Sequence, residues 1–296
     1  MADPRLKQML SEKKFIVAPG IFDMISARVA DRMGFSALYA TGYGTVASHL
    51  GVPDAGIATF TDMVSRMARF AQASKTPVIA DADTGYGGLL NVRHTVMGYE
   101  AGGVTAIQLE DQEVPKKCGH TPGRRVIPAE EMALKIEVAA EARKSSDFLI
   151  IARTDARTTL GLDEAIRRGR IYRKAGADIV FIESPETEDE MKRIGQEIDA
   201  PLLANNVDGG GRTPILSAEK LASFGYSIAI YPALGFLTVA QALEKSYAHL
   251  LQHGDTNALP DGVIGDFARM NELMGFPEVW DFDKRWSRPE PQRAAE

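Results

Sequence analysis

The sequence has a single cysteine and no excess of positive charge. One cysteine cannot form an intrachain disulfide framework, which fits a reducing compartment. A formal net charge of -6 excludes a general nucleic-acid surface, because binding of phosphates needs clustered cations. We therefore expect a small-molecule partner and no nucleic acid.

Long apolar runs are also missing. The polar start Met1–Arg5 lacks the apolar core of a signal peptide. The longest apolar stretches, such as Ile228–Tyr231, are too short to span a bilayer and are typical of buried strands. We expect a cytoplasmic protein without a membrane partner.

Short apolar runs that alternate with helical patterns are abundant instead, in a chain of 296 residues that can bury one large α/β core. The runs typical of strands are Phe15–Pro19, Ala37–Thr41, Val78–Asp83, Ala106–Asp111, Leu149–Thr154, Ile179–Glu183, Pro201–Asn205 and Ile228–Pro232. The helical patterns between and after them are Met24–Met33, Phe60–Ser74, Leu90–Ala101, Ala129–Ala142, Leu162–Ala175, Glu188–Glu197, Ala218–Phe224 and Leu237–Leu251. This alternation predicts a (β/α)₈ barrel of the TIM type, with an open doubly wound sheet as the alternative.

The pattern changes after Leu251, so we predict one barrel domain over 1–296 in which 255–296 is a helical extension and tail. An amphipathic helix is expected at Gly262–Met274, and the tail Arg288–Glu296 is expected to be poorly ordered. The extension either covers the barrel floor or packs on a neighbouring subunit through aromatic residues, namely Phe276, Trp280, Phe282 and Trp286.

Polar side chains close most of the predicted strands. In a barrel such residues meet at the carboxyl face, where active sites lie. Asp81 and Asp83 alternate along one strand, and Glu110 ends the next, so their oxygens could hold a magnesium ion. Arg153 could clamp a substrate carboxylate, with a structural ion pair to Glu183 as the alternative.

The single cysteine lies in Lys116-Lys117-Cys118-Gly119-His120, a run in which neighbouring cations favour the thiolate. A buried, unreactive cysteine is the alternative, but adjacent lysines argue against burial. Close approach to an anion is allowed by Gly42, Gly44, Gly85, Gly87 and Gly88, while neither a Rossmann nor a Walker fingerprint is present. A thiol acid/base beside a metal is therefore predicted.

These motifs resemble the isocitrate lyase/phosphoenolpyruvate mutase superfamily over nearly the whole chain. The resemblance rests on Thr41-Gly42-Tyr43, Asp81–Gly87, Leu109–Gln112, Lys116–His120 and Ile151–Asp155. The Lys-Lys-Cys-Gly-His run resembles the carbon–carbon lyase branch. Within that branch the chain is most similar to the group of 2,3-dimethylmalate lyase, petal death protein and oxaloacetate hydrolase, and then to methylisocitrate lyase.

The resemblance implies a barrel that uses Mg²⁺ or Mn²⁺, a homotetramer that exchanges its last helices, and a mobile loop carrying Cys118. It implies metal-site roles for Asp81, Asp83 and Glu110. It implies catalytic roles for Cys118, Lys117, His120, Glu183, Arg153 and Tyr39. It implies substrate binding by Thr41, Gly42, Tyr43, Asp54, Arg153 and Asn205.

The implied reaction is cleavage of a 2-hydroxy dicarboxylate, such as 2,3-dimethylmalate or methylisocitrate, into a 2-oxo acid and a carboxylic acid. Val207 stands where isocitrate and methylisocitrate lyases tend to present a hydroxyl group, which disfavours a tricarboxylate. Tyr43 is bulkier than the usual residue of methylisocitrate lyases. The alternatives are an oxaloacetate hydrolase or decarboxylase, a phosphonate-type mutase, and a barrel that only binds a metabolite.

Overall fold

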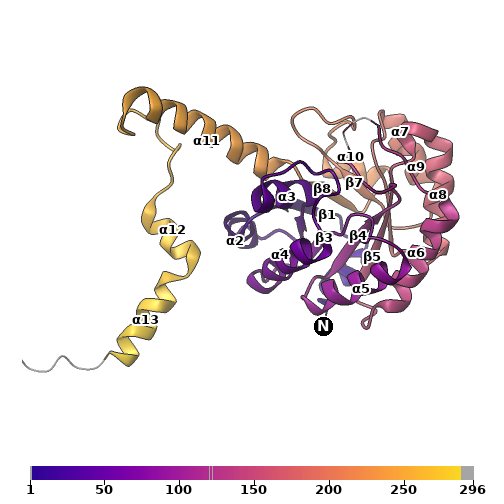
Figure 1. Ribbon diagram of the computed structural model, residues 1–296, viewed down its shortest axis with the longest axis horizontal. Coiled ribbons are helices and arrows are strands. Elements are labelled where there is room, and N and C mark those ends of the chain that lie inside the picture. The colour runs from indigo at the N-terminus through magenta and orange to yellow at the C-terminus, as the bar shows by residue number, and fades with distance from the viewer. Residues whose placement is uncertain (1, 120, 122, 288–296) are drawn as a thin grey trace, which may run out of the picture. The chain divides into compact units, whose positions relative to one another are not determined.

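The computed structural model describes residues 2–119, 121 and 123–287, and the chain divides into two compact units, Met1–Val239 and Ala240–Glu296 (Figure 1). The first unit holds eight parallel strands. They are β1 (Ile16–Ile21), β2 (Leu38–Ala40), β3 (Val78–Asp81), β4 (Ala106–Glu110), β5 (Leu149–Thr154), β6 (Ile179–Ile182), β7 (Leu203–Asn205) and β8 (Ile228–Tyr231). The predicted tail Arg288–Glu296 lies outside the described residues.

The strands form one closed ring. Their hydrogen-bonded order is β6-β5-β4-β3-β2-β1-β8-β7, and a parallel bridge between Val180 and Leu202 joins the two ends. The predicted (β/α)₈ barrel is confirmed, and the open-sheet alternative is wrong. Closure leaves no strand edge exposed and brings all the carboxyl ends to one face.

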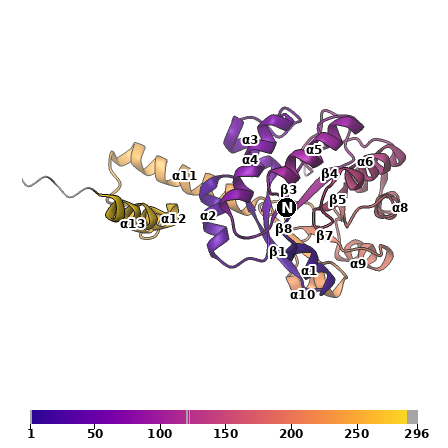
Figure 2. The same cartoon turned by 90° about the horizontal axis from the view of Figure 1, so that it is seen from below.

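Helices surround this ring, as Figure 2 shows for α4, α5, α6, α8 and α9. The helices of the first unit are α1 (Arg5–Ser11), α2 (Met24–Arg32), α3 (Gly42–Leu50), α4 (Phe60–Ala73), α5 (Leu89–Ala101), α6 (Ala129–Ala142), α7 (Arg157–Leu160), α8 (Leu162–Lys174), α9 (Glu188–Glu197) and α10 (Ala218–Ser223). Of these, α1, α3 and α7 were not predicted. They are short, or rich in glycine, so their apolar periodicity is weak.

The barrel interior is a packed apolar core. Inward-facing residues of successive strands form one cluster, including Ile79, Ile151, Phe181 and Leu203. Leu6 of α1 is fully buried in the same cluster. The short helix before the first strand therefore packs against the interior cluster through Leu6, while covering the barrel floor was one of the two roles expected for the C-terminal extension.

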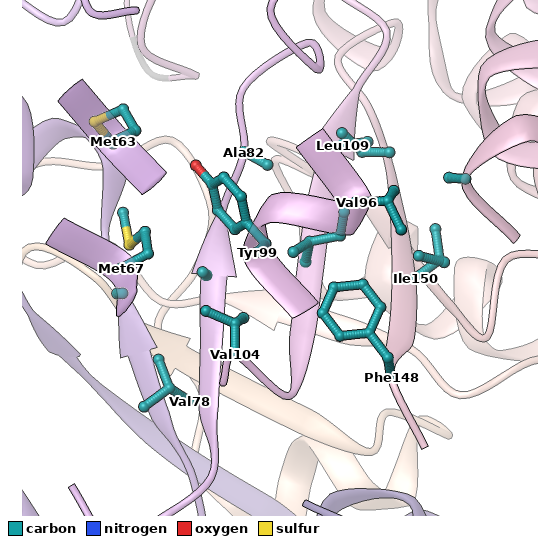
Figure 3. Close-up of a cluster of buried hydrophobic side chains, with 14 of the residues drawn as sticks. Met63, Met67, Val78, Ala82, Val96, Tyr99, Val104, Leu109, Phe148 and Ile150 are labelled. Atoms are coloured by element: carbon teal, nitrogen blue, oxygen red, sulfur yellow. The ribbon is translucent and has the colours of Figure 1, made fainter. Parts of the chain in front are cut away.

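A second apolar layer lies between the strands and the outer helices. Figure 3 shows Tyr99 of α5 among side chains of α4, β3, β4 and β5, with Met63, Met67 and Phe148 nearby. These residues are almost fully removed from water, which contributes about 1.5–3 kcal/mol for each large side chain. This layer fixes the helices and loops that carry the site.

The second unit is helical. Helix α11 (Leu234–His253) runs into it from the first unit, and α12 (Phe267–Met274) and α13 (Phe276–Trp286) follow. The predicted helix at Gly262–Met274 starts later, because Asp266 caps it by accepting from the Arg269 amide at 2.8 Å. In the described part of the chain, no helix is long and apolar enough to cross a membrane.

Candidate active site

The site follows from strand alternation. Residues two apart on a strand face the same side, so inward apolar residues continue as polar residues where each strand ends. Ile79 is followed by Asp81, Ile151 by Arg153 and Phe181 by Glu183. Together with the loop around Cys118, these ends enclose a cavity of about 300 Å³.

Most of the predicted site residues line this cavity. They are Tyr39, Thr41, Tyr43, Asp54, Asp81, Glu110, Lys117, Cys118, Arg153, Glu183 and Asn205. Gly42 lies behind Asp81, and Asp83 lines a neighbouring cavity together with Lys116. His120 lies outside the described residues.

A buried lysine organises the acidic side of the cavity. The Lys116 ammonium donates to the Asp54 carboxylate and forms an ion pair with Asp83, with all three side chains nearly buried. Asp81 Oδ1 accepts from the Asp83 amide at 3.0 Å. Burial, with the neighbouring carboxylate next, raises the pKa of Asp81, and burial also raises the pKa of Asp83.

Gly42 permits this arrangement of the acidic residues. A Cβ atom at position 42 would lie 2.5 Å from Asp81 Oδ2, which is closer than any normal contact. Gly42 is also the first residue of α3, so the glycines at 42 and 44, expected to allow close approach to an anion, lie in a helix. Close approach of the Asp81 side chain explains why glycine is required at position 42.

The donor set fits a divalent metal. Buried carboxylates around the cavity outnumber the buried cations: the acids are Asp54, Asp81, Asp83, Glu110, Asp155 and Glu183, and the cations are Lys116, Arg124 and Arg153. Glu110 Oε1 is buried without a hydrogen-bond partner among the described residues. Burial raises the pKa of Glu110 well above its usual range, so a nearby cation would favour its charged form.

The described residues hold no ready-made cage for this metal. Among them, no three acidic, histidine or cysteine side chains gather closely enough to hold an ion by themselves. Magnesium keeps several waters and often takes only one or two protein carboxylates, so it does not require a closed cage of side chains.

Arg153 is held by three carboxylates. Its Nε and Nη2 each donate to Asp155 at 2.9 Å, while Glu110 lies 3.2 Å from Nη1 and Glu183 lies 3.5 Å from Nη2. Asp155, the main partner of Arg153, was part of neither interpretation of Arg153 from the sequence, the substrate clamp or the ion pair with Glu183. The guanidinium also lies over the ring of Phe181, at 5.4 Å.

The far wall pairs an acid with an amide. Asn205 Nδ2 donates to Glu183 Oε2 at 3.0 Å, and the Ser184 amide donates to Glu183 Oε1 at 2.7 Å. Deeper in the barrel, the Tyr39 hydroxyl donates to Gln108 at 3.1 Å. Burial, and then Asp81, raises the pKa of Tyr39 well above its usual range, so this hydroxyl stays protonated at neutral pH.

The loop after β4 places the thiol at the cavity. The Cys118 amide donates to the Asp54 carbonyl at 3.2 Å, and Ser184 Oγ donates to the Gly119 carbonyl at 3.2 Å. Cys118 is half-buried and Lys117 is exposed, whereas Lys116 is buried. The argument from two exposed lysines beside Cys118 thus holds for Lys117 but not for Lys116. The burial of Lys116 could not be predicted, because its two buried carboxylate partners are distant in the sequence.

Comparison with known proteins identifies relatives that cover nearly the whole chain. The family model described as phosphoenolpyruvate phosphomutase matches residues 6–251. The chain is 48% identical to the 2,3-dimethylmalate lyase of Eubacterium barkeri, over 96% of this chain and 97% of that protein. It is 39% identical to the 2-methylisocitrate lyase of Halalkalibacterium halodurans, over 94% and 90%. A structure of oxaloacetate acetylhydrolase with 3,3-difluorooxalacetate superposes with a TM-score of 0.90 at 34% identity, over 97% of each chain. The chain belongs to the phosphoenolpyruvate mutase/isocitrate lyase superfamily.

Proposed function

We propose that the protein is a magnesium-dependent carbon–carbon lyase that splits a substituted malate into a 2-oxo acid and a carboxylic acid. One observation carries this proposal. A thiol, an acid-rich oxygen cluster and a buried arginine line the same cavity, in a chain that is 48% identical to a 2,3-dimethylmalate lyase. The lyase interpretation thus rests on the site as well as on the relatives.

Magnesium, or manganese in its place, is assigned to Asp81, Asp83 and Glu110. When bound, such an ion stabilises negative charge that develops on the oxygen of the 2-oxo acid. Glu110 Oε1, which lacks a hydrogen-bond partner among the described residues, supports its assignment. Asp54 is assigned to the same end of the cavity, where it fixes Lys116.

The oxo-acid end of the substrate is assigned to Arg153 and to Thr41, Gly42 and Tyr43 at the start of α3. Arg153 is oriented by two parallel hydrogen bonds to Asp155, so it need not reorganise when charge develops. Asn205, at the opposite wall, is assigned to the second carboxylate.

As the C2–C3 bond breaks, the C2 hydroxyl becomes the oxo group and gives its proton to a carboxylate of the acid-rich cavity. The bonding electrons stay on the departing carboxylate fragment, which must be protonated at carbon. We assign this proton to the Cys118 thiol, which faces the cavity. Lys117, His120 and Glu183 are assigned the role of setting the electrostatic environment of this thiol. Tyr39 is assigned as a neutral donor in this scheme, because its hydroxyl donates to Gln108 at 3.1 Å and burial raises its pKa well above the usual range.

Apolar side chains near the mouth favour an alkyl-substituted substrate. Tyr43 and Phe236 pack with ring centroids 5.1 Å apart, and Val207 and Leu237 line the same cavity. No hydroxyl is present at position 207 to receive a third carboxylate. A substituted malate such as 2,3-dimethylmalate therefore fits better than methylisocitrate.

We also propose a homotetramer in which the last helices are exchanged between subunits. Large apolar side chains in the second unit are exposed in the single chain, among them Tyr247, Phe267, Trp280, Phe282 and Trp286. Aromatic residues on exposed helix faces are typical of subunit interfaces.

The test is a cleavage assay with magnesium on 2,3-dimethylmalate, other 2-alkylmalates, methylisocitrate, isocitrate and oxaloacetate, with both products identified by mass. We expect a 2-oxo acid plus a carboxylic acid from an alkylmalate. Turnover of oxaloacetate alone, to oxalate and acetate or to pyruvate, would contradict the lyase proposal.

A further inference from the structure

A second buried arginine stands directly behind Arg153. Arg124 Nη1 forms an ion pair with Asp155 Oδ1, the oxygen that also accepts from Arg153 Nη2. Arg124 Nη2 donates to Thr158 Oγ1 at 2.6 Å. One carboxylate is therefore shared by two guanidinium groups, and the outer one is anchored to α7.

Local backbone structure explains why Arg124 faces inward. The segment pairs with the residues that follow β4: Gln112 and Val126 form an antiparallel bridge, and the Glu113 amide donates to the Arg125 carbonyl at 2.9 Å. Neighbours along an extended segment face opposite sides. Arg124 is buried, whereas the side chain of Arg125 is 76% exposed and pairs with Glu113.

The consequence is electrostatic. The cavity already holds more buried carboxylates than cations, and its proposed substrate carries two negative charges. The positive charge of Arg124 partly neutralises the Asp155 carboxylate. Without Arg124, this carboxylate would repel an anionic substrate more strongly and would offset more of the positive charge of Arg153. The Arg124–Asp155 pair also keeps the carboxylate in the orientation that fixes the plane of the Arg153 guanidinium.

We propose that Arg124 is a positioning residue, which acts through Asp155 to set the orientation and the effective charge of Arg153 toward an anionic oxo acid. This inference rests on the proposed function. It assigns a role to a residue that does not line the cavity, and it predicts an effect on binding of the anion more than on the chemical step.

The experiment measures the Kd of oxalate in the presence of magnesium, together with kcat and KM for the alkylmalate that the wild type cleaves. Oxalate carries two adjacent carboxylates, like the planar end of a 2-oxo acid. For Arg124→Met we expect Kd and KM to rise about tenfold, with a smaller change in kcat, since one nearby charge is lost. Arg124→Lys should recover most of the affinity, and Arg125→Met should match the wild type.

Arg124→Gln, which keeps a hydrogen-bond donor to Asp155 but no charge, replaces the methionine variant if that variant does not fold. Equal oxalate affinity in the wild type and in the neutral variants would overturn the inference and leave the proposed function intact. Oxalate binding by the wild type without cleavage of any malate would overturn the proposed reaction alone. A wild type that does not bind oxalate would overturn both.

Discussion

At the scale of single residues, the chemistry depends on one thiol placed against an acid-rich cavity. Cys118 lies on a loop that is held by two hydrogen bonds. The Cys118 amide donates to the Asp54 carbonyl, and the Ser184 hydroxyl donates to the Gly119 carbonyl. A proton donor fixed by backbone contacts loses little entropy when it reacts. The thiol itself should therefore be replaceable without disturbing the loop.

Cys118→Ser tests this point. A serine hydroxyl is a much weaker acid than a thiol, and loss of a positioned general acid lowers kcat about 10²–10⁴-fold. Binding of oxalate in the presence of magnesium should stay within about threefold of the wild type, because no anion contact is removed. Unchanged turnover in steady-state assays would show that Cys118 is not the proton donor.

Gly42→Ala tests the packing of the metal site. The added methyl group would lie 2.5 Å from Asp81 Oδ2, so the carboxylate must move. We expect the magnesium concentration for half-maximal activity to rise about tenfold, as for other changes that disturb the orientation of a metal ligand. Gly88→Ala is the control, because a Cβ there meets open space. Equal magnesium dependence in both variants would contradict this role.

Strand-end polarity in the sequence predicted which of these residues meet, but not how they pair. Alternation along strands brought Asp81, Glu110, Arg153 and Glu183 to one cavity, as expected. The partnership of Arg153 with Asp155 was missed, because it depends on side-chain orientation within a turn. The burial of Arg124 could not be predicted from the sequence, because it depends on the antiparallel pairing of its segment with the residues after β4.

At the scale of elements, the strands were predictable because parallel strands that are buried on both faces read as continuous β-branched runs. Helix α3 was not, since Gly42 and Gly44 disfavour a helix by propensity. A Cβ at Gly44 would lie 2.7 Å from Phe22, so tertiary packing required glycine in spite of the helix. At these positions helix propensity disfavours glycine whereas tertiary packing requires it, and such a conflict is common at functional sites.

Helix α8 locks the strand ends from outside. Arg168 and Tyr172 donate to Asp111 Oδ2 at 2.9 and 2.8 Å, and Thr154 donates to the same atom at 2.6 Å. Glu164 fixes Arg168 from the first turn of α8. Hydrogen bonds from Arg167, and also from Arg168, lower the pKa of Glu164 to about 2.

This network predicts a pH dependence of stability. The folded-state pKa of Glu164 lies below its ordinary value of 4.5, so its contribution is present above pH 4.5 and is lost as pH falls toward 2. At pH 7 we expect Glu164→Gln to lower the free energy of unfolding, and each kcal/mol of that loss lowers Tm by roughly 2–4 °C. The difference in Tm between Glu164→Gln and the wild type should shrink as pH falls below 4.5 and vanish near pH 2. Glu141→Gln, at an exposed position of α6, should melt like the wild type throughout. A constant difference in Tm between pH 7 and pH 3 would contradict this role of Glu164.

At the scale of the whole molecule, the last helices expose many large apolar side chains in the single chain. Each of α11, α12 and α13 exposes large apolar side chains, and Leu251 and Phe267 are the most exposed among them. The side chains of amphipathic helices need a partner surface, and a second copy of the chain supplies one in the proposed tetramer.

The assembly is tested by light scattering in solution. We expect a mass of four times the chain mass of 32.2 kDa. Introducing charge with Phe282→Glu and Trp286→Glu should shift the protein toward smaller species, since an interface that buries aromatic residues does not accept unpaired charges. A wild-type monomer at micromolar concentration would contradict the proposed exchange of helices.

In the proposed reaction, this barrel breaks a carbon–carbon bond and then protonates the departing fragment at carbon. The most direct measurement is turnover of 2,3-dimethylmalate with magnesium in deuterated water, followed by mass analysis of both products. We predict pyruvate together with propionate that carries one solvent-derived deuterium, and loss of both products in Cys118→Ser. Absence of pyruvate and propionate from the wild-type reaction would contradict the account.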